Sequence, residues 1–420
     1  MVGVADENDR FEWTCLDGVP EDVPLTGSPN GPRGGVSASG EDVGRYTSIA
    51  ADGDGNLHIT YRDETNKTLK YIFGQASGQS WDWAEPYVMD EDGDVGLWSE
   101  ISVGVDGLIA VAYMAPGVPV EDPTLPVATS KLRWAQATAA VPTAADWTFE
   151  DVDTQQVDSP CNGGCSAGQK CRADLNVCER SQAASRCDNA CADSQSCFEQ
   201  GDAFVCAEVA QLPTIVSLPE GTGLFASVAR FSNGDAAVAY YHRTGGDLMF
   251  ARQNDGAWQA PVILDGRAEN GDDLTDAGQF ASIAIDAQDN VHIAYVDAVT
   301  DDLRYINLTE GVSELVDDGI RPTPDGVSVN LVGDASAIII DDEGVVRIAY
   351  QDTSAHQLML ARRIEGRWEV LSLAGGGESY TGAYGFYNQH ALVEGRSLVT
   401  TYRYHRQVDP PLNGLTVHRF

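Results

Sequence analysis

The stretch YTSIAADGDGNLHITYRD, residues 46–63, decides the fold because the chain repeats it. Apolar and β-branched residues alternate on both sides of a turn rich in Gly, Asp and Asn, which is the pattern of a β-hairpin. Related segments start at five further residues: Trp98, Phe225, Phe280, Ala335 and, in a divergent form, Phe386. The tyrosines near the ends of the six patterns are Tyr61, Tyr113, Tyr240, Tyr295, Tyr350 and Tyr402. A period of about 50 residues predicts an array of small structural units.

Each unit continues with two further strands. A strand with a leucine follows most of the tyrosines, and a strand with a tryptophan and a closing apolar–Asp pair comes after it, as between Trp83 and Asp90. Four short antiparallel strands in about 50 residues describe a β-propeller blade. The sixth unit ends at its third strand, whereas the N-terminal segment 11–18, FEWTCLDG, carries the signature of a fourth. We therefore expect an all-β, six-bladed β-propeller with four antiparallel strands per blade, closed by the N-terminal strand.

A long interval between Tyr113 and Tyr240 contains an insertion, which divides the chain into three parts. Residues 1–157 hold the closing strand and blades 1 and 2, residues 158–208 form a Cys-rich insert, and residues 209–420 hold blades 3 to 6. The insert contains two four-Cys repeats of EGF-like size: Cys161, Cys165, Cys171, Cys178, Cys187, Cys191, Cys197 and Cys206. We expect two disulfides in each repeat, with three connectivities open for each. Cys15 is left over, and its place in a predicted strand suggests a buried thiol.

Charge and cysteine content limit the classes of partner and the compartment. The chain has 64 acidic and 26 basic residues, a formal charge of −38. Such a charge argues against nucleic acid and anionic lipid, which both require clusters of basic residues. No apolar stretch is long enough for a transmembrane helix. Cysteines gathered in a short segment are typical of oxidising compartments, so we expect an extracytoplasmic protein that is secreted, periplasmic or at the cell surface.

The blade pattern SIA-D-G-N-HIAY-D resembles that of the sialidase-like, BNR-type bacterial propellers. The resemblance covers everything except the Cys-rich insert and some loops. It implies a propeller fold, while its implication for function is broad because propellers host many activities. The Asp-box of sialidases, S-x-D-x-G-x-x-W, is absent from the blades of this chain.

Aromatic residues recur two positions before the Ser position of the repeat. In a propeller the first strand of each blade lies nearest the central channel, so these residues are expected around its inner mouth. They either pack between neighbouring blades or form a stacking platform for a sugar or an aromatic ligand. The candidate ligand-binding aromatics are Tyr46, Trp98, Phe225, Phe280 and Phe386.

A second set of candidates follows the repeat tyrosines, in loops expected on the same face. Arginine binds two oxygens of an anion with its planar fork, and this property makes Arg62, Arg243 and Arg403 candidate ligand-binding residues. Neutral imidazole is a good ligand for transition metals, and the candidate metal set is His242, His405 and His356. In contrast, His58 and His292 occupy one repeated mid-strand position, which indicates a structural role.

Two functions from different classes remain open at this point. The first is an exported, non-enzymatic binding or scaffold protein that holds a carbohydrate or a partner protein with the channel mouth and the Cys-rich insert. The alternative is an enzyme on the same face, either a metal-dependent lyase or oxidase using the channel histidines or a divergent sialidase-like glycosidase. Acidic loops such as residues 90–94 and 269–273 make Ca²⁺ a possible cofactor, although their spacing is not diagnostic. The catalytic residues are not indicated by any motif.

Overall fold

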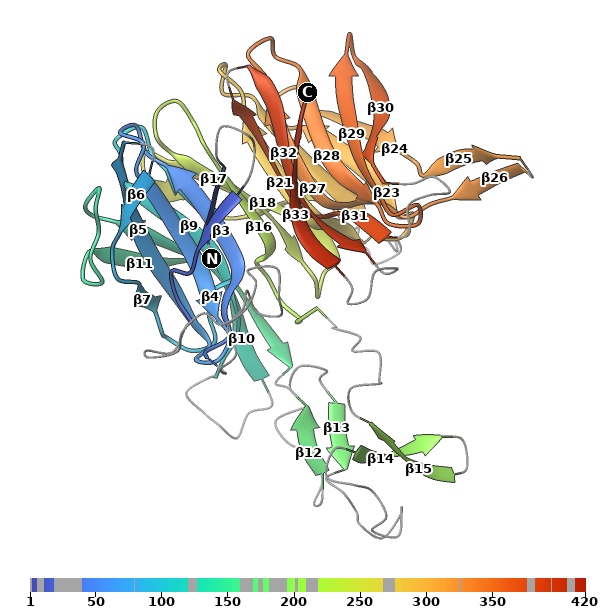
Figure 1. Ribbon diagram of the computed structural model, residues 1–420, viewed down its shortest axis with the longest axis horizontal. Helices are drawn as coiled ribbons and strands as arrows, with labels where there is room; N and C mark the ends of the chain where they lie inside the picture. The colour runs from blue at the N-terminus through green and yellow to red at the C-terminus, as the bar shows by residue number, and fades with distance from the viewer. Residues whose placement is uncertain are drawn as a thin grey trace.

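The computed structural model describes residues 2–5, 11–18, 40–78, 80–119, 127–158, 169–172, 177–180, 195–200, 203–208, 218–266, 276–324, 326–375, 382–393, 395–405 and 412–420. Every regular element in these ranges is a strand (Figure 1). The long strands form six antiparallel sheets that follow one another along the chain, and the first strand of each sheet contacts the first strand of the next, from blade 1 to blade 6. The fold is therefore the six-bladed β-propeller that the repeat predicts.

The first three blades each use four strand positions, and the fourth is split into two short strands in blades 1 and 3. Blade 1 consists of β3 (Val43–Ala51), β4 (Leu57–Asp63), β5 (Thr68–Ser77), β6 (Ser80–Trp83) and β7 (Tyr87–Asp90). Blade 2 consists of β8 (Leu97–Val103), β9 (Ile109–Pro119), β10 (Val127–Ala137) and β11 (Trp147–Asp158). Blade 3 consists of β16 (Leu224–Arg230), β17 (Ala236–His242), β18 (Asp247–Asn254), β19 (Ala257–Trp258) and β20 (Val262–Asp265).

The last three blades continue the same order, and a projecting hairpin separates blades 4 and 5 (Figure 1). Blade 4 consists of β21 (Ala277–Ile285), β22 (Val291–Asp297), β23 (Asp302–Asn307) and β24 (Val312–Asp317). The hairpin is β25 (Ile320–Thr323) and β26 (Gly326–Val329). Blade 5 consists of β27 (Val332–Ile340), β28 (Val346–Asp352), β29 (Gln357–Ile364) and β30 (Arg367–Ala374). Blade 6 consists of β31 (Gly382–Val393), β32 (Arg396–His405) and β33 (Leu412–Arg419).

The hydrophobic core lies between consecutive blades. Leu69 and Tyr71 of blade 1, for example, pack against Ile109 and Tyr113 of blade 2. Equivalent clusters join blades 2 and 3, 3 and 4, 4 and 5, and 5 and 6. Both faces of blades 2 to 5 are therefore buried, which explains why the second strand of these blades reads as an almost continuous apolar run.

Each repeat tyrosine from blade 1 to blade 5 donates a hydrogen bond to an aspartate from the segment that precedes its blade. The bonds join Tyr61 to Asp17 (2.6 Å), Tyr113 to Asp90 (2.5 Å), Tyr240 to Asp153 (2.8 Å), Tyr295 to Asp265 (2.5 Å) and Tyr350 to Asp317 (2.5 Å). All five tyrosine rings are buried. A buried hydroxyl bonded to a carboxylate contributes about 1.5–3 kcal/mol. The aspartate of the apolar–Asp signature thus links one blade to the next through this hydrogen bond, here called the latch.

The N-terminal segment supplies the latch for blade 1, although its backbone pairs differently from expectation. Asp17 accepts the hydrogen bond from Tyr61 and an ion pair from Lys70, and Leu16 packs on the core of blade 1. However, β2 (Phe11–Thr14) pairs with β1 (Val2–Ala5), and within the described residues no strand pairs with the outer edge of β33. A hairpin neighbour only a few residues away already occupies one edge of β2. The structure thus shows the contact of the closing segment with blade 1, but not its pairing with blade 6.

Four short strands lie within the insert. They form two hairpins, β12 (Gln169–Arg172) with β13 (Val177–Arg180), and β14 (Gln195–Gln200) with β15 (Ala203–Glu208). The backbone register sets Cys171 opposite Cys178 and Cys197 opposite Cys206. The other four cysteines of the insert, Cys161, Cys165, Cys187 and Cys191, lie outside the described residues, and the disulfides remain predictions. Cys15 is a half-buried free thiol.

Candidate functional site

The first strand of every blade contains the same β-bulge, and the bulge residue lies in the left-handed region. Its φ is between 47° and 52° in all six blades, at Tyr46, Trp98, Phe225, Phe280, Ala335 and Tyr387. The register with the second strand shifts at each of these positions. Bulky residues rarely adopt positive φ, so a sixfold repetition marks a built feature of the ring. The equivalent residue in blade 6 is Tyr387 and not Phe386, which instead pairs in register with Tyr402.

Four of the bulge residues form a continuous row of rings, here called the aromatic arc: Tyr46, Trp98, Phe225 and Phe280. Their centroids are 5.1, 5.2 and 4.6 Å apart in this order, and neighbouring planes are tilted by 50°, 55° and 45°. The rings pack against rings of adjacent blades and still remain partly exposed, with Tyr46 36% exposed. Both predicted roles, packing between blades and presentation at the mouth, are therefore compatible with one arrangement. Phe386 does not belong to the arc.

Backbone contacts across the blades hold the bulge in its unusual conformation. The Ser99 hydroxyl donates to the Tyr46 carbonyl oxygen (2.6 Å), and the Ser336 hydroxyl donates to the Phe280 carbonyl oxygen (2.6 Å). The Asn388 amide donates to the Ala335 carbonyl oxygen in the same way (3.2 Å). A strained backbone conformation persists where surrounding contacts hold it in place. These hydrogen bonds to the carbonyl oxygens of the bulge residues provide such contacts.

A half-buried acid lies two residues beyond Trp98, where blades 1, 3 and 4 carry serine. Those serine oxygens accept backbone N–H groups of the next blade, such as Ile101 on Ser48 (3.1 Å) and Ile283 on Ser227 (3.1 Å). In blade 2 the acid is Glu100, which accepts hydrogen bonds from Ser227 and from the backbone of Val228. Burial outweighs these bonds and raises the pKa of Glu100 to about 7. A carboxyl group with a pKa of about 7 thus lies two residues beyond Trp98, a member of the arc.

Replacing Glu100 with glutamine should make stability less sensitive to pH between 5 and 8. Because the folded-state pKa is raised above the unfolded value, the folded chain binds the extra proton, and wild-type stability falls as the pH rises through this window. Relative to wild type, E100Q should gain on the order of 2 kcal/mol between pH 5 and pH 8. Urea unfolding at both pH values measures this, with the exposed E369Q as the control. A pH-independent difference would contradict the assignment.

The predicted anion-binding arginines are already paired with carboxylates. Arg62 is buried, pairs with Glu64 (2.8 Å) and Asp94 (2.6 Å), and donates to the Val95 carbonyl oxygen. Arg243 pairs with Glu220 (3.1 Å). Arg403 is exposed, with the Tyr384 hydroxyl 3.5 Å from its Nη1. The first two therefore hold loops in place, and no set of guanidinium groups converges as an anion site within the described residues.

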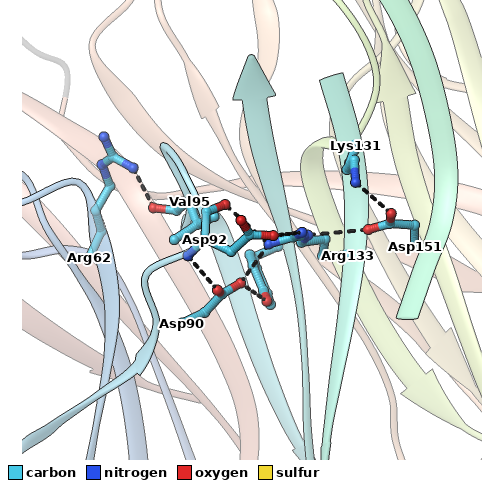
Figure 2. Close-up of polar contacts among 8 residues, drawn as sticks. Arg62, Asp90, Asp92, Val95, Lys131, Arg133 and Asp151 are labelled. Atoms are coloured by element: carbon cyan, nitrogen blue, oxygen red, sulfur yellow. Dashed lines mark hydrogen bonds and ion pairs between the residues drawn. The ribbon is translucent and has the colours of Figure 1, made fainter. Parts of the chain in front are cut away.

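A larger polar network, which the sequence analysis does not predict, joins blades 1 and 2. Arg133 on β10 contacts Asp90 (3.0 Å), Asp92 (2.6 Å) and Asp151 (3.2 Å), and Lys131 contacts Asp151 (2.6 Å), as Figure 2 shows. The hydrogen bond from Arg133 lowers the pKa of Asp92. The repeat contains a pattern from which such a network could be predicted. The residue opposite the repeat tyrosine on the third strand is basic in three blades: Lys70, Arg133 and Arg304.

This network also bears on the acidic loop considered for Ca²⁺. Asp90 and Asp92 face Arg133, and Asp94 faces Arg62, so these carboxylates have cationic partners in the protein itself. The second acidic loop, residues 269–273, lies outside the described residues. Calcium stays a prediction without support from the first loop.

The histidines proposed as a metal set are not brought together in the described part of the chain. His242 has its Nδ1 3.5 Å from Asp247 in its own hairpin, and His356 is exposed in a turn with φ 59°. The side chain of His405 lies outside the described residues. Where side chains are described, no three His, Cys, Asp or Glu residues gather as metal ligands. A transition metal at this face stays a prediction.

His58 and His292 form the same buried contacts in blades 1 and 4, as their shared position predicts. Nδ1 of His58 is 2.6 Å from the Tyr71 hydroxyl, and Nε2 is 3.4 Å from Asp52. His292 repeats both distances with Tyr305 and Asp286. Burial lowers the pKa of both histidines despite their aspartates. The contacts tie a turn to a third strand and are structural.

No protein-family model matches this sequence, and no curated protein sequence matches it. Solved structures with a similar course of the chain include an α-L-arabinofuranosidase of Fusarium graminearum in complex with arabinobiose, with 9% identity, 96% of each chain covered and a TM-score of 0.47. A polysaccharide lyase acting as an ulvan lyase has 11% identity, covers 100% of this chain and 87% of its own, and has a TM-score of 0.44.

A leech intramolecular trans-sialidase, complexed with 2,7-anhydro-Neu5Ac, has 10% identity, covers 90% of this chain and 68% of its own, and has a TM-score of 0.40. Sialidases, to whose repeats the blade pattern is similar, are thus among the similar structures. At these identities and TM-scores the similarity carries no argument about activity, so the function is argued from the residues. No helix long and apolar enough to span a membrane occurs among the described residues.

Proposed function

We propose that this protein is an exported binding protein that takes up its ligand at the inner mouth of the propeller, on the aromatic arc. The observation that carries the proposal is the uninterrupted row of four rings on four consecutive blades, presented by a conformation that aromatic residues rarely adopt. Binding sites are mostly lined by apolar and aromatic groups with a few polar ones, and the arc with Glu100 behind it has this composition. Ligands with a flat apolar face, such as sugars, and side chains of a partner protein are the candidates.

The arrangement of the charged residues favours binding over catalysis. The glycosidase alternative requires arginines that converge on an anionic or polar substrate, whereas Arg62 and Arg243 are already paired with acids of neighbouring loops. Glu100 is bonded to Ser227 and Val228 of the next blade. The cysteine-rich insert supports the extracytoplasmic location, because disulfide frameworks persist in oxidising compartments.

Trp98→Ala should weaken ligand binding about 30-fold or more, with little change of fold. Alanine is tolerated at this bulge because blade 5 carries Ala335 with φ 52° at the equivalent position. Loss of a central aromatic contact typically costs about 2 kcal/mol or more, which is about a 30-fold loss of affinity. The measurement is a glycan array followed by calorimetric titration of any ligand found.

Two further variants make this test specific. Trp81→Ala, on β6 at the outer part of blade 1, should leave affinity unchanged, and Ala335→Phe should extend the arc and leave affinity equal or higher. A ligand that binds W98A as tightly as wild type would place the site elsewhere on the propeller.

A further inference from the structure

We propose that blade 6 packs onto blade 1 in solution and closes the propeller ring, and that this movement adds Tyr387 to the aromatic arc beside Tyr46. The closing itself goes beyond the proposed function, whereas the part of Tyr387 in ligand binding rests on that function. Four features of the seam between blades 6 and 1 support the proposal, where a seam is the surface between two neighbouring blades. They are an exposed isoleucine, unused hydrogen-bonding groups, the position of Tyr387 and the charge of the two blades.

The aliphatic residue three positions after each bulge residue shows how tightly a blade packs on the blade before it. In blades 2 to 5 this side chain is only 6% to 8% exposed and belongs to the core cluster at the seam with the preceding blade. These residues are Ile101, Val228, Ile283 and Ile338. Ile49 has the same position in blade 1, at the seam with blade 6, and is 54% exposed. Since burial of an aliphatic side chain is favourable, this seam has a driving force for closing.

The same seam has the groups for hydrogen bonds that the other seams form. At each of the other five seams, a side chain donates to the carbonyl oxygen of the preceding bulge residue, or a backbone N–H donates to the side-chain oxygen two residues beyond it. The corresponding donors in blade 1 are the Thr47 hydroxyl and the Ile49 N–H, and the corresponding acceptors in blade 6 are the oxygens of Tyr387 and Gln389. Thr47 instead donates to Gly44 of its own strand (2.7 Å). The two strands that contain these residues, β3 and β31, also lack the contact that the other neighbouring first strands make.

Tyr387 has the backbone position of an arc residue without an arc contact. It occupies the bulge of blade 6 with φ 52°, and its side chain is 81% exposed. Among the described residues its ring contacts only Tyr402 of its own blade, with the centroids 6.5 Å apart. Burial raises the pKa of Tyr46, and the nearby Tyr387 adds a smaller contribution to this rise. Because neighbouring rings of the arc are 4.6 to 5.2 Å apart, a packed seam would place Tyr387 next to Tyr46 as a fifth ring.

The charges of the two blades favour their approach. Residues 43–90, which form blade 1, include seven acidic and four basic residues, a net charge of −3. Residues 382–420, which form blade 6, include two acidic and four basic residues, a net charge of +2. Opposite net charges attract each other, and salt weakens this attraction.

Hydroxyl-radical footprinting of the full chain tests the closing, because the rate of side-chain oxidation reports solvent exposure. Ile263 on β20 is the matched reference, since it is the same residue type and is also 54% exposed. We expect Ile49 to be oxidised at least about threefold more slowly than Ile263, because the measured rate averages over a population in which closed rings dominate. Equal rates for the two isoleucines would overturn the proposal, and this comparison needs no variant.

Photo-oxidative cross-linking of tyrosines tests the position of Tyr387. We expect an intramolecular dityrosine bond between Tyr46 and Tyr387, which Tyr46→Phe and Tyr387→Phe each remove. The bond between Tyr387 and Tyr402, whose rings already contact each other within blade 6, is the internal reference. Formation of the reference bond without the bond to Tyr46 would overturn the place of Tyr387 in the arc.

A charged variant tests the link between the two observations. Ile49→Asp should keep the ring open, because closing would bury an unpaired carboxylate. We expect faster oxidation of Tyr387 and loss of its cross-link to Tyr46, whereas Ile263→Asp should change neither. If Ile49→Asp also changes neither, closing through this seam is overturned.

These measurements use no ligand, so their failure is distinct from a failure of the proposed function. An open ring would leave the four-ring arc and its test with Trp98→Ala as they are. A closed ring without any ligand in the glycan array would contradict the proposed function and the binding role of Tyr387, but not the closing.

Discussion

Replacing Arg133 with methionine should lower the free energy of unfolding by about 3 to 5 kcal/mol. The Arg133 guanidinium is buried and contacts Asp90, Asp92 and Asp151, and the side chain of Asp90 is itself only 5% exposed. Methionine has a similar volume, so packing is largely kept while the buried carboxylate of Asp90 loses its cation. The cost arises because a charge that stays buried without a partner is far less favourable than a paired one.

Urea unfolding at pH 7 measures this effect, and the chain offers a matched control. Arg362 pairs with Glu369 at 3.0 Å, but both side chains are much more exposed, at 33% and 52%. Exposed ion pairs contribute about 0–1 kcal/mol, so Arg362→Met should change stability little. The double variant R133M with Asp90→Asn should recover part of the loss, because the orphaned charge is gone. Equal losses in R133M and R362M would contradict a buried ionic joint between blades 1 and 2.

The sequence predicts the blades well because the repeat acts at two levels. The alternation of residues in YTSIAADGDGNLHITYRD defines the hairpin locally, and the recurrence of Tyr and Asp defines the contact between blades. The structure gives each pair a physical meaning, since Tyr113 binds Asp90 and Tyr295 binds Asp265. Blade 6 is predicted less well, because blade 5 ends in Leu373-Ala374 and offers Tyr402 no aspartate.

The candidate site could be predicted only in part. The recurrence of aromatic residues locates the arc, but the bulge that turns these residues into the left-handed region has no signature such as glycine. In blade 6 two aromatic residues are adjacent, and only the register shows that Tyr387 rather than Phe386 takes the bulge position. The partners of Arg62 could not be predicted for a different reason. Asp94 is 32 residues away along the chain, and only the course of the loop that contains Asp94 brings its carboxylate to Arg62.

Replacing Asp317 with asparagine should lower the free energy of unfolding by about 3 kcal/mol at pH 7. It should also make the free energy of unfolding less dependent on pH below about 4. Asp317 ends blade 4 and accepts two hydrogen bonds from Arg321 (2.8 and 2.7 Å), one from Tyr350 (2.5 Å) and one from the backbone of Gly319 (3.0 Å). Burial alone raises the pKa of Asp317, but the bonds from Arg321 and Tyr350 outweigh it and lower the pKa below the usual value.

The direction of the pH effect follows from this lowered pKa. In the unfolded chain the carboxyl group titrates near about 3.9, so above that pH its contribution to stability is fully present. As the pH falls from about 4 through the folded-state pKa, the unfolded chain binds the proton first and the contribution is lost. The asparagine variant has no such proton to bind. The difference in stability between wild type and D317N should therefore shrink as the pH falls below 4.

Urea unfolding between pH 2.5 and 7 tests both parts of this prediction, with the exposed Asp342→Asn as control. A constant difference between wild type and D317N across this range would show that the carboxylate is not ionically bound in the folded chain. A second comparison separates the tyrosine from the arginine. Tyr350→Phe removes one hydrogen bond and should cost less than D317N, since Arg321 keeps its paired contact with the carboxylate. If Y350F costs as much as D317N, the joint between blades 4 and 5 depends on the tyrosine and not on the ion pair.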